Sequence, residues 1–242
     1  MIHLSVNLNK VALIRNSRGR NFPDLLQVAQ DCVRYGADGI TLHPRPDERH
    51  ARQQDIRELK PALNVELNVE GYPSEEFLAL IEATKPAQAT LVPDPPEALT
   101  SSAGWDTLTH ETFLRDVVAR IQAAGVRASI FIETDLARID KARDIGTDRV
   151  ELYTEAYATE FAQGNRYAVE PYVQAGQHAK AIGLGLNAGH DLNLHNLAFF
   201  AKKLPILDEV SIGHALVCDA LYLGLAETIR RYQHCLGKKT SA

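Results

Sequence analysis

The sequence predicts an α/β protein with the (β/α)8 TIM-barrel fold and extra helices. About eight short runs rich in Val, Ile and Leu recur along the 242 residues, and stretches with helical spacing separate them. In YGADGI, AAGVRAS, DIGTDRV and AIGLGLN a helix end, a Gly and a strand follow one another, which is typical of parallel strands with right-handed crossovers. An open doubly wound sheet is the alternative fold, but no GxGxxG follows the first run.

The eight apolar runs have the length of ordinary strands. We expect strands at residues 2–8, 38–43, 64–69, 88–92, 127–132, 149–153, 183–188 and 209–214.

The segments between these runs have apolar residues at helical spacing. Residues 23–36 end on Gly36, a plausible residue just past a helix end, and Ser74 is a plausible N-cap of a helix that Pro86 terminates. Further helices are expected within residues 113–125, 136–146, 168–183, 196–205 and 220–237.

No interdomain linker interrupts this alternation, so we expect residues 1–242 to form a single domain. The least regular segment, residues 93–111, is longer than a usual loop after a barrel strand. It is either a lid over the active site or a solvated surface loop. Residues 154–168 are a second candidate for a lid.

Composition excludes several classes of protein. A net charge of -5 argues against a general nucleic-acid or anionic-membrane binder. The three cysteines form no CxxC pair, which favours free thiols in a reducing cytoplasm. No secretory signal and no apolar run of roughly 18 residues is visible. We therefore expect a cytoplasmic protein that holds any anionic ligand in a local site.

Polar residues gather at the carboxyl ends of the expected strands, which is where barrel enzymes have their active sites. They are Asn7, Asn9, Lys10, Arg15 and Arg18 after the first strand, His43, Arg45 and His50 after the second, Glu70 after the third, Glu151 in the sixth, Asn187 and His190 at the seventh, and Ser211, Gly213 and His214 at the eighth. Each of these residues alone could be structural or simply solvated. Together they place acids, bases and cations at one rim, as acid–base chemistry requires.

The last two expected strands each lead into a Gly-His pair, in NAGHDLN and SIGHALV. Barrels commonly bind a phosphate near these loops through backbone N–H groups and a helix N-terminus. No HxH, HxxxH or Asp-rich spacing predicts a metal site, and no lysine within a strand predicts a Schiff base.

The chain resembles the pyridoxine 5′-phosphate synthase family of vitamin B6 biosynthesis over nearly its whole length. The resemblance depends on the stretches VNLNKVALIRNSRG, GADGITLHPRPDERH, LNVEGYPSEEFLALIEATKP, QATLVPD, RVELYTEAYA, GLNAGHDLNLHN and SIGHAL. It implies a barrel with extra helices, an octamer built from dimers, and no metal or organic cofactor. It also implies condensation of 1-deoxy-D-xylulose 5-phosphate with 3-amino-2-oxopropyl phosphate to give pyridoxine 5′-phosphate, phosphate and water.

The resemblance also implies a role for each matching residue. His43 and Glu70 would be general bases, His190 the proton donor and Glu151 the group that stabilises the transition state. The contacts to the amino-ketone phosphate would be Asn7, Arg18, Gly213 and His214. The contacts to the deoxyxylulose phosphate would be Asn9, Lys10, Arg45, His50 and Thr100. Asp191 would be a further substrate contact.

Two positions depart from the pattern of some family members. Asn9-Lys10 stands where they have Asp-His, and Asp191 stands where they have Gly. Two rival functions also remain open: a phosphosugar isomerase or epimerase, and a barrel that binds phosphate without catalysis. Phe199, Phe200, Tyr222 and Leu223 are either core residues or subunit contacts.

Overall fold

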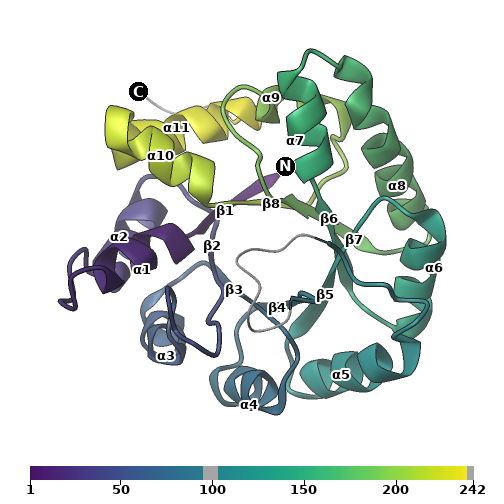
Figure 1. Cartoon of the computed structure of the whole chain (residues 1–242), viewed down its shortest axis with the longest axis horizontal. Coiled ribbons are helices and arrows are strands. Elements are labelled where there is room, and N and C mark those ends of the chain that lie inside the picture. The colour runs from purple at the N-terminus through teal and green to yellow at the C-terminus, as the bar shows by residue number, and fades with distance from the viewer. Residues whose placement is uncertain (95–102, 239–242) are drawn as a thin grey trace.

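Eight parallel strands close into a barrel in the computed structural model, which describes residues 1–94 and 103–238 (Figure 1). Each strand pairs with its neighbours in chain order, and β8 pairs with β1. The strands are β1 (His3–Asn7), β2 (Gly39–Leu42), β3 (Glu66–Gly71), β4 (Gln88–Leu91), β5 (Arg127–Ile132), β6 (Arg149–Tyr153), β7 (Gly185–Gly189) and β8 (Glu209–Ile212). The expected (β/α)8 barrel is confirmed.

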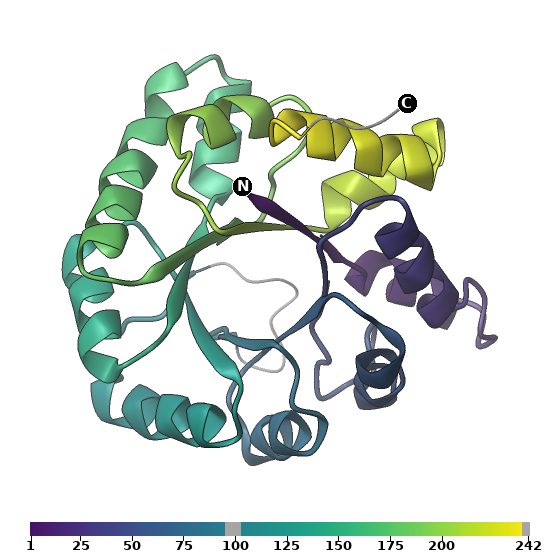
Figure 2. The same cartoon turned by 180° about the vertical axis from the view of Figure 1, so that it is seen from behind.

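Helices surround the barrel on its outer side, as the views from the front and from behind both show (Figures 1 and 2). Several connections contain more than one helix, which confirms the expected extra helices. The helices are α1 (Asn9–Asn16), α2 (Leu25–Arg34), α3 (Gln53–Ala62), α4 (Glu75–Thr84), α5 (Glu111–Ala123), α6 (Leu136–Ile145), α7 (Glu155–Ala162), the 3₁₀ helix η1 (Arg166–Val169), α8 (Glu170–Ala181), α9 (Leu197–Lys203), α10 (His214–Leu223) and α11 (Leu225–Cys235).

Local sequence explains where several helices begin and end. The Ser74 side chain accepts a hydrogen bond from the Phe77 N–H and caps α4, as expected, and Asp24 caps α2 in the same way. Gly146 ends α6 in the left-handed conformation, with φ +96°, which glycine adopts without strain.

Three expected segments differ from the structure, and one helix was not expected. Strand β8 ends at Ile212, and His214 is the first residue of α10 rather than the last of a strand. The single helix expected over 220–237 is divided into α10 and α11 by Gly224, whose φ is +77°. Residues 154–168, the second candidate for a lid, contain α7 and part of η1. Helix α1 begins directly after β1, in a segment for which no helix was expected.

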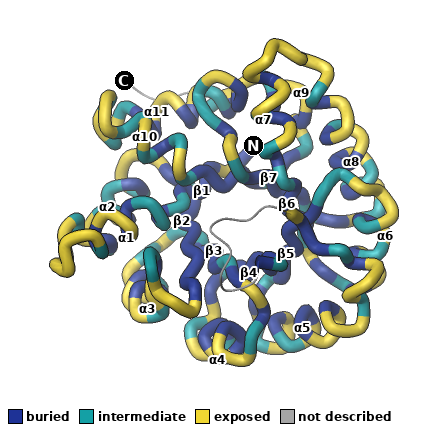
Figure 3. Tube along the Cα trace, viewed as in Figure 1, coloured by how far each residue is buried: buried dark blue, intermediate teal, exposed yellow. Residues whose placement is uncertain are grey.

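Apolar residues of the strands pack outward against the helices, and the strands are buried along most of their length (Figure 3). Several inward side chains are polar instead. Ser5 and Thr41 share a hydrogen bond of 2.6 Å, Asn68 donates to Thr41, and Thr90 donates to Asn68 over 3.0 Å. Barrels of this kind usually fill these layers with Val, Ile and Leu. The polar interior therefore continues from the barrel centre toward the site at its rim.

In the described part of the chain, no helix combines the length and apolar character needed to cross a membrane. Cys32, Cys218 and Cys235 are free thiols.

Candidate active site

Glu70 lies near the carboxyl end of β3, in contact with β1. Asn7 Nδ2 donates a hydrogen bond of 3.3 Å to Glu70 Oε2. Burial raises the pKa of Glu70 to about 7, while the positive charge of His190 and hydrogen bonds from Asn7 and Ser211 oppose the rise. Glu70 can therefore accept and return a proton near neutral pH.

Glu151 projects from β6 into the barrel beside β7. A side chain on Gly189 would overlap Glu151 Oε1, so the missing side chain of the glycine provides the space for this carboxyl group. Burial, and then the charges of Glu70 and Glu209, raise the pKa of Glu151 well above its usual range. Its Oε2 has no hydrogen-bond partner among the described residues. Burial therefore favours the protonated form of Glu151, which can donate a hydrogen bond.

His43 follows directly after β2, and its backbone is fixed to the first strand. The His43 N–H donates to Asn9 Oδ1 over 2.9 Å, and the Asn9 N–H donates to Asn7 Oδ1 over 3.0 Å. Burial lowers the pKa of His43 well below its usual range, and the positive charge of Arg45 adds to the effect. A neutral histidine of this kind is able to act as a base.

His50 faces His43, with ring centroids 6.1 Å apart and the rings inclined at 69°. Burial, followed by the charges of Arg45 and Arg49, lowers the pKa of His50 to about 4. The Ala51 N–H donates to His50 Nδ1 over 2.9 Å, so the ring proton of the neutral form lies on Nε2. His50 can thus offer a neutral N–H donor to a ligand.

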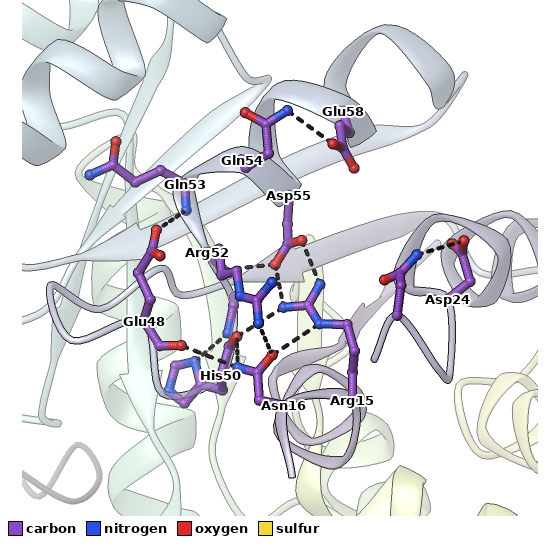
Figure 4. Close-up of polar contacts among 12 residues, drawn as sticks. Arg15, Asn16, Asp24, Glu48, His50, Arg52, Gln53, Gln54, Asp55 and Glu58 are labelled. Carbon is purple, nitrogen blue, oxygen red and sulfur yellow. Dashed lines mark hydrogen bonds and ion pairs between the residues drawn. The ribbon is translucent and has the colours of Figure 1, made fainter. Parts of the chain in front are cut away.

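A polar clamp from α1 holds the loop that carries these histidines (Figure 4). Arg15 forms a buried bidentate ion pair with Asp55, with contacts of 2.6 and 3.0 Å, and also donates to the His50 carbonyl. Asn16 Nδ2 donates to the three successive carbonyl groups of residues 48–50. These contacts tie the loop to α1, while residues 46–48 within it remain exposed to solvent.

Arg45 and Asp94 form a second buried ion pair, of 2.8 Å, at the ends of β2 and β4. Asp94 was not predicted as a site residue. In the sequence, Asp94 is marked only by its place in LVPD at the end of the fourth strand. Its ion-pair partner Arg45 lies 49 residues earlier, so the pairing is not visible in the local sequence. The pair holds the Arg45 guanidinium beside His43, where both residues line a hollow with Tyr72 and Phe77.

His190 and Asp191 follow β7. His190 Nδ1 lies 2.7 Å from Asp191 Oδ2, and the edge of the His190 ring meets the Tyr153 ring with centroids 5.0 Å apart. The effect of His190 on the pKa of Glu70 places these two side chains within electrostatic reach of each other. The predicted proton donor and one predicted base therefore lie at one rim.

Gly213 and His214 lie at the start of α10, next to β1. A side chain on Gly213 would come within 3.1 Å of the Asn7 backbone oxygen, so the two strand ends pack tightly. His214 is exposed at the first position of α10, and Asn9 and Lys10 occupy the first turn of α1. Two helix N-termini near the rim are suited to anionic groups.

Two predicted residues do not join this group. Arg18 is exposed on the connection between α1 and α2, which projects from the side of the barrel (Figure 1). Thr100 lies outside the described residues. The same holds for residues 95–102 of the candidate lid over 93–111. In the later part of that segment Trp105 is buried, and its backbone N–H donates to the Phe131 carbonyl over 2.8 Å.

Glu209 is a further buried carboxyl group that the sequence pattern did not single out. It lies on β8, two residues before Ser211, and burial raises the pKa of Glu209 to about 7. The strand alternation could have revealed it, because Ser211 faces the barrel interior and residues two apart on a strand share a face. Among residues 1–94 and 103–238, no group of three or more His, Cys, Asp or Glu could hold a metal ion.

Comparison with solved structures supports the fold. The chain is similar to phosphoribosylanthranilate isomerase from Thermotoga maritima, with 13% identity, a TM-score of 0.61, and coverage of 98% of this chain and 99% of that one. It is also similar to the tryptophan synthase α-subunit from Pyrococcus furiosus, with 14% identity, a TM-score of 0.64, and coverage of 98% of each chain. At such low identity these similarities establish the barrel alone.

Sequence comparison is far more specific. A family model described as pyridoxal phosphate biosynthesis protein PdxJ matches residues 4–238. A protein of Porphyromonas gingivalis named pyridoxine 5′-phosphate synthase is 58% identical over 233 residues, covering 96% of this chain and 98% of the relative. A protein of the same name from Parabacteroides distasonis is 57% identical over 236 residues, covering 98% of this chain and 99% of the relative. The chain therefore belongs to the PdxJ family of pyridoxine 5′-phosphate synthases, enzymes of vitamin B6 biosynthesis.

Proposed function

We propose that the chain condenses 1-deoxy-D-xylulose 5-phosphate with 3-amino-2-oxopropyl phosphate to form pyridoxine 5′-phosphate, phosphate and water. The observation that carries this proposal is the set of four acid–base side chains at one rim: His43, Glu70, Glu151 and His190. A single isomerisation or simple phosphate binding would not require so many groups. Membership of the synthase family supports the same reaction.

The reaction needs several proton transfers. An amine attacks a ketone, water leaves, phosphate is eliminated, and a carbon–carbon bond closes the ring. His43 and Glu70 act as bases, because one is neutral and the other has a pKa of about 7. His190 donates a proton to a leaving oxygen. Burial favours the protonated form of Glu151, which donates a hydrogen bond to the negative charge that develops in the transition state.

The two phosphorylated substrates occupy neighbouring parts of the rim. Asn7, Arg18, Gly213 and His214 contact the amino-ketone phosphate, and the Asp191 backbone is a further substrate contact. The contacts to the deoxyxylulose phosphate are Asn9, Lys10, Arg45, His50 and Thr100. Backbone N–H groups at the start of α10 suit the first anion, and the buried Arg45 guanidinium suits the second.

The change from Asp-His to Asn9-Lys10 is compatible with this assignment. The Asn9 side chain accepts a hydrogen bond from the His43 N–H, a role that an aspartate would also fill. Lys10 adds a positive charge close enough to His50 to contribute to the lowering of its pKa. That charge favours a phosphate nearby.

We further propose that residues 1–242 form a single cytoplasmic domain that assembles into an octamer and needs no metal or organic cofactor. One closed barrel that uses strands from both ends of the chain supports the single domain. Leu221 and Tyr222 of α10, 74% and 91% exposed, support assembly through that surface, whereas Phe200 is a core residue.

The test is to supply the purified protein with both phosphates and to follow the ultraviolet absorbance of the pyridoxine ring, with each substrate alone as a control. Ring product that forms only when both are present supports the proposal. Conversion of the ketose phosphate alone favours the isomerase, and binding without turnover favours the non-catalytic barrel.

A further inference from the structure

We propose that Asp191 is a positioning residue: its carboxylate orients the His190 ring and stabilises the protonated ring, so that His190 delivers its proton from Nε2. This inference rests on the proposed function, in which His190 is the proton donor. It assigns to the Asp191 side chain a role different from the substrate contact suggested by the family resemblance.

The contact between the two side chains is short. His190 Nδ1 and Asp191 Oδ2 are 2.7 Å apart, and the two side chains are 24% and 42% exposed. The hydrogen bond to His190 lowers the pKa of Asp191 below its usual range, so the carboxylate is ionised at neutral pH. An ionised carboxylate can only accept this hydrogen bond, so Nδ1 carries a proton. The proton that the charged ring gives to a substrate is therefore the one on Nε2.

The backbone explains how two adjacent residues come to face each other. His190 has φ +86° and Asp191 has φ +59°, two successive left-handed residues that are not glycine. The Thr154 hydroxyl contacts the carbonyls of Gly189 and His190 at 2.8 and 2.5 Å, and Asn196 Nδ2 donates to the Asp191 carbonyl over 3.1 Å. Such strain persists only where the surroundings fix it, and it clusters at functional sites.

Other titratable groups surround the His190–Asp191 pair. Tyr153 packs against the His190 ring from β6, and Glu70 lies within electrostatic reach from β3. Glu151 lies against Gly189, immediately before His190. His214, at the start of α10, is near enough to contribute to the lowering of the pKa of Asp191. A test must therefore separate the Asp191 charge from changes in these neighbours.

Asp191→Asn and Asp191→Gly suit this purpose. Asn and Gly both tolerate the left-handed conformation, so neither change should disturb the loop. Asp140→Asn is the matched control, because Asp140 contacts His178 Nε2 at 2.5 Å on the outer helices α6 and α8, outside the site described above.

We expect both Asp191 variants to lower kcat by about 10-fold to 100-fold, with KM changed by less than about threefold, since part of a general-acid contribution is lost. The loss should grow with pH, because the charged ring loses its stabilising partner. The two variants should therefore differ most from the wild type on the alkaline side of the kcat profile. The acid limb should move less, and Asp140→Asn should match the wild type throughout.

A second readout is independent of turnover. In proton–nitrogen correlation spectra of the imidazole rings, with the His190 signal assigned from His190→Gln, the wild type should show a proton on Nδ1 that Asp191→Gly loses. The inference would be overturned if both Asp191 variants kept the kcat and the pH profile of the wild type. It would also be overturned if kcat fell equally at every pH while the Nδ1 signal stayed unchanged. A wild-type protein that makes no ring product from both substrates would instead overturn the proposed function.

Discussion

At the scale of single residues, the site depends on carboxyl groups whose pKa values are raised by burial. Burial raises the pKa of Glu70 to about 7, and burial followed by the charge of Glu70 raises the pKa of Glu151 well above its usual range. Glu70 can therefore exchange protons near neutral pH, while Glu151 remains a hydrogen-bond donor.

Glu70→Gln should remove most turnover and leave substrate binding largely intact. Gln keeps the shape and the hydrogen bonding of Glu but cannot take up a proton, so we expect kcat to fall by roughly 10²-fold to 10⁴-fold. Steady-state kinetics and calorimetric binding of the ketose phosphate would measure both effects. Glu66→Gln, at the other end of the same strand, should keep its kcat. Near-normal turnover in Glu70→Gln would reject Glu70 as a base.

Glu209→Gln should stabilise the protein at pH 8 and change little at pH 5. Burial raises the pKa of Glu209 from 4.5 to about 7, so the folded state binds this proton more tightly than the unfolded state. The free energy of unfolding therefore falls as pH rises through this interval, by up to about 3 kcal/mol from this residue. Glutamine removes the cost of the buried charge. Thermal melts at both pH values test this, and a lower Tm of the variant at pH 8 would show that Glu209 is ionised and stabilised by Arg149.

At the scale of elements, β7 provides both the space for one catalytic group and the turn for another. A side chain on Gly189 would overlap Glu151 Oε1, and the strand leads directly into His190. The glycine is needed here because of this close approach, whereas its backbone conformation is ordinary.

Gly189→Ala should displace the Glu151 carboxyl group and reduce kcat by about 10-fold or more, because transition-state donors act only in the correct position. The melting temperature should change little, because the carboxyl group at the far end of the Glu151 side chain can move away from the new methyl group. The shorter side chain of Glu151→Asp leaves room for the new methyl group. In the variant that combines Gly189→Ala with Glu151→Asp, kcat should therefore fall by less than the product of the two single reductions. Strictly multiplicative losses would contradict the proposed overlap.

Much of the fold at this scale is predictable because apolar runs and glycines mark strands and helix ends directly. The break at Gly224 is hidden because the apolar pattern of 220–237 continues across it, and only the positive φ reveals it. Helix α1 is hidden because Asn9 and Lys10 have the character of a polar loop. Its clamp on residues 48–50 depends on contacts between distant segments.

The site is predictable in part for a similar reason. Barrel topology brings strand ends together, so the amino-acid sequence alone is enough to group His43, Glu70, Glu151 and His190. The pairing of Arg45 with Asp94 and the left-handed turn that joins His190 to Asp191 do not follow from residue types. Both depend on tertiary geometry.

At the scale of the whole molecule, we expect an octamer in solution. The exposed Leu221 and Tyr222 side chains would be covered by such an assembly. Light scattering on a sizing column should give a mass about eight times the chain mass of 26.7 kDa. Leu221→Ser with Tyr222→Ser should shift that mass downward. A wild-type mass near that of one chain would contradict the assembly.

The condensation itself is tested most directly by the stoichiometry of its products. Chelator-treated protein receives both substrates, and inorganic phosphate and the ring chromophore are measured in the same sample over time. The proposed reaction releases phosphate and pyridoxine 5′-phosphate in equal amounts, only when both substrates are present and without added metal. Phosphate release without the ring product, or turnover of the ketose phosphate alone, would contradict it.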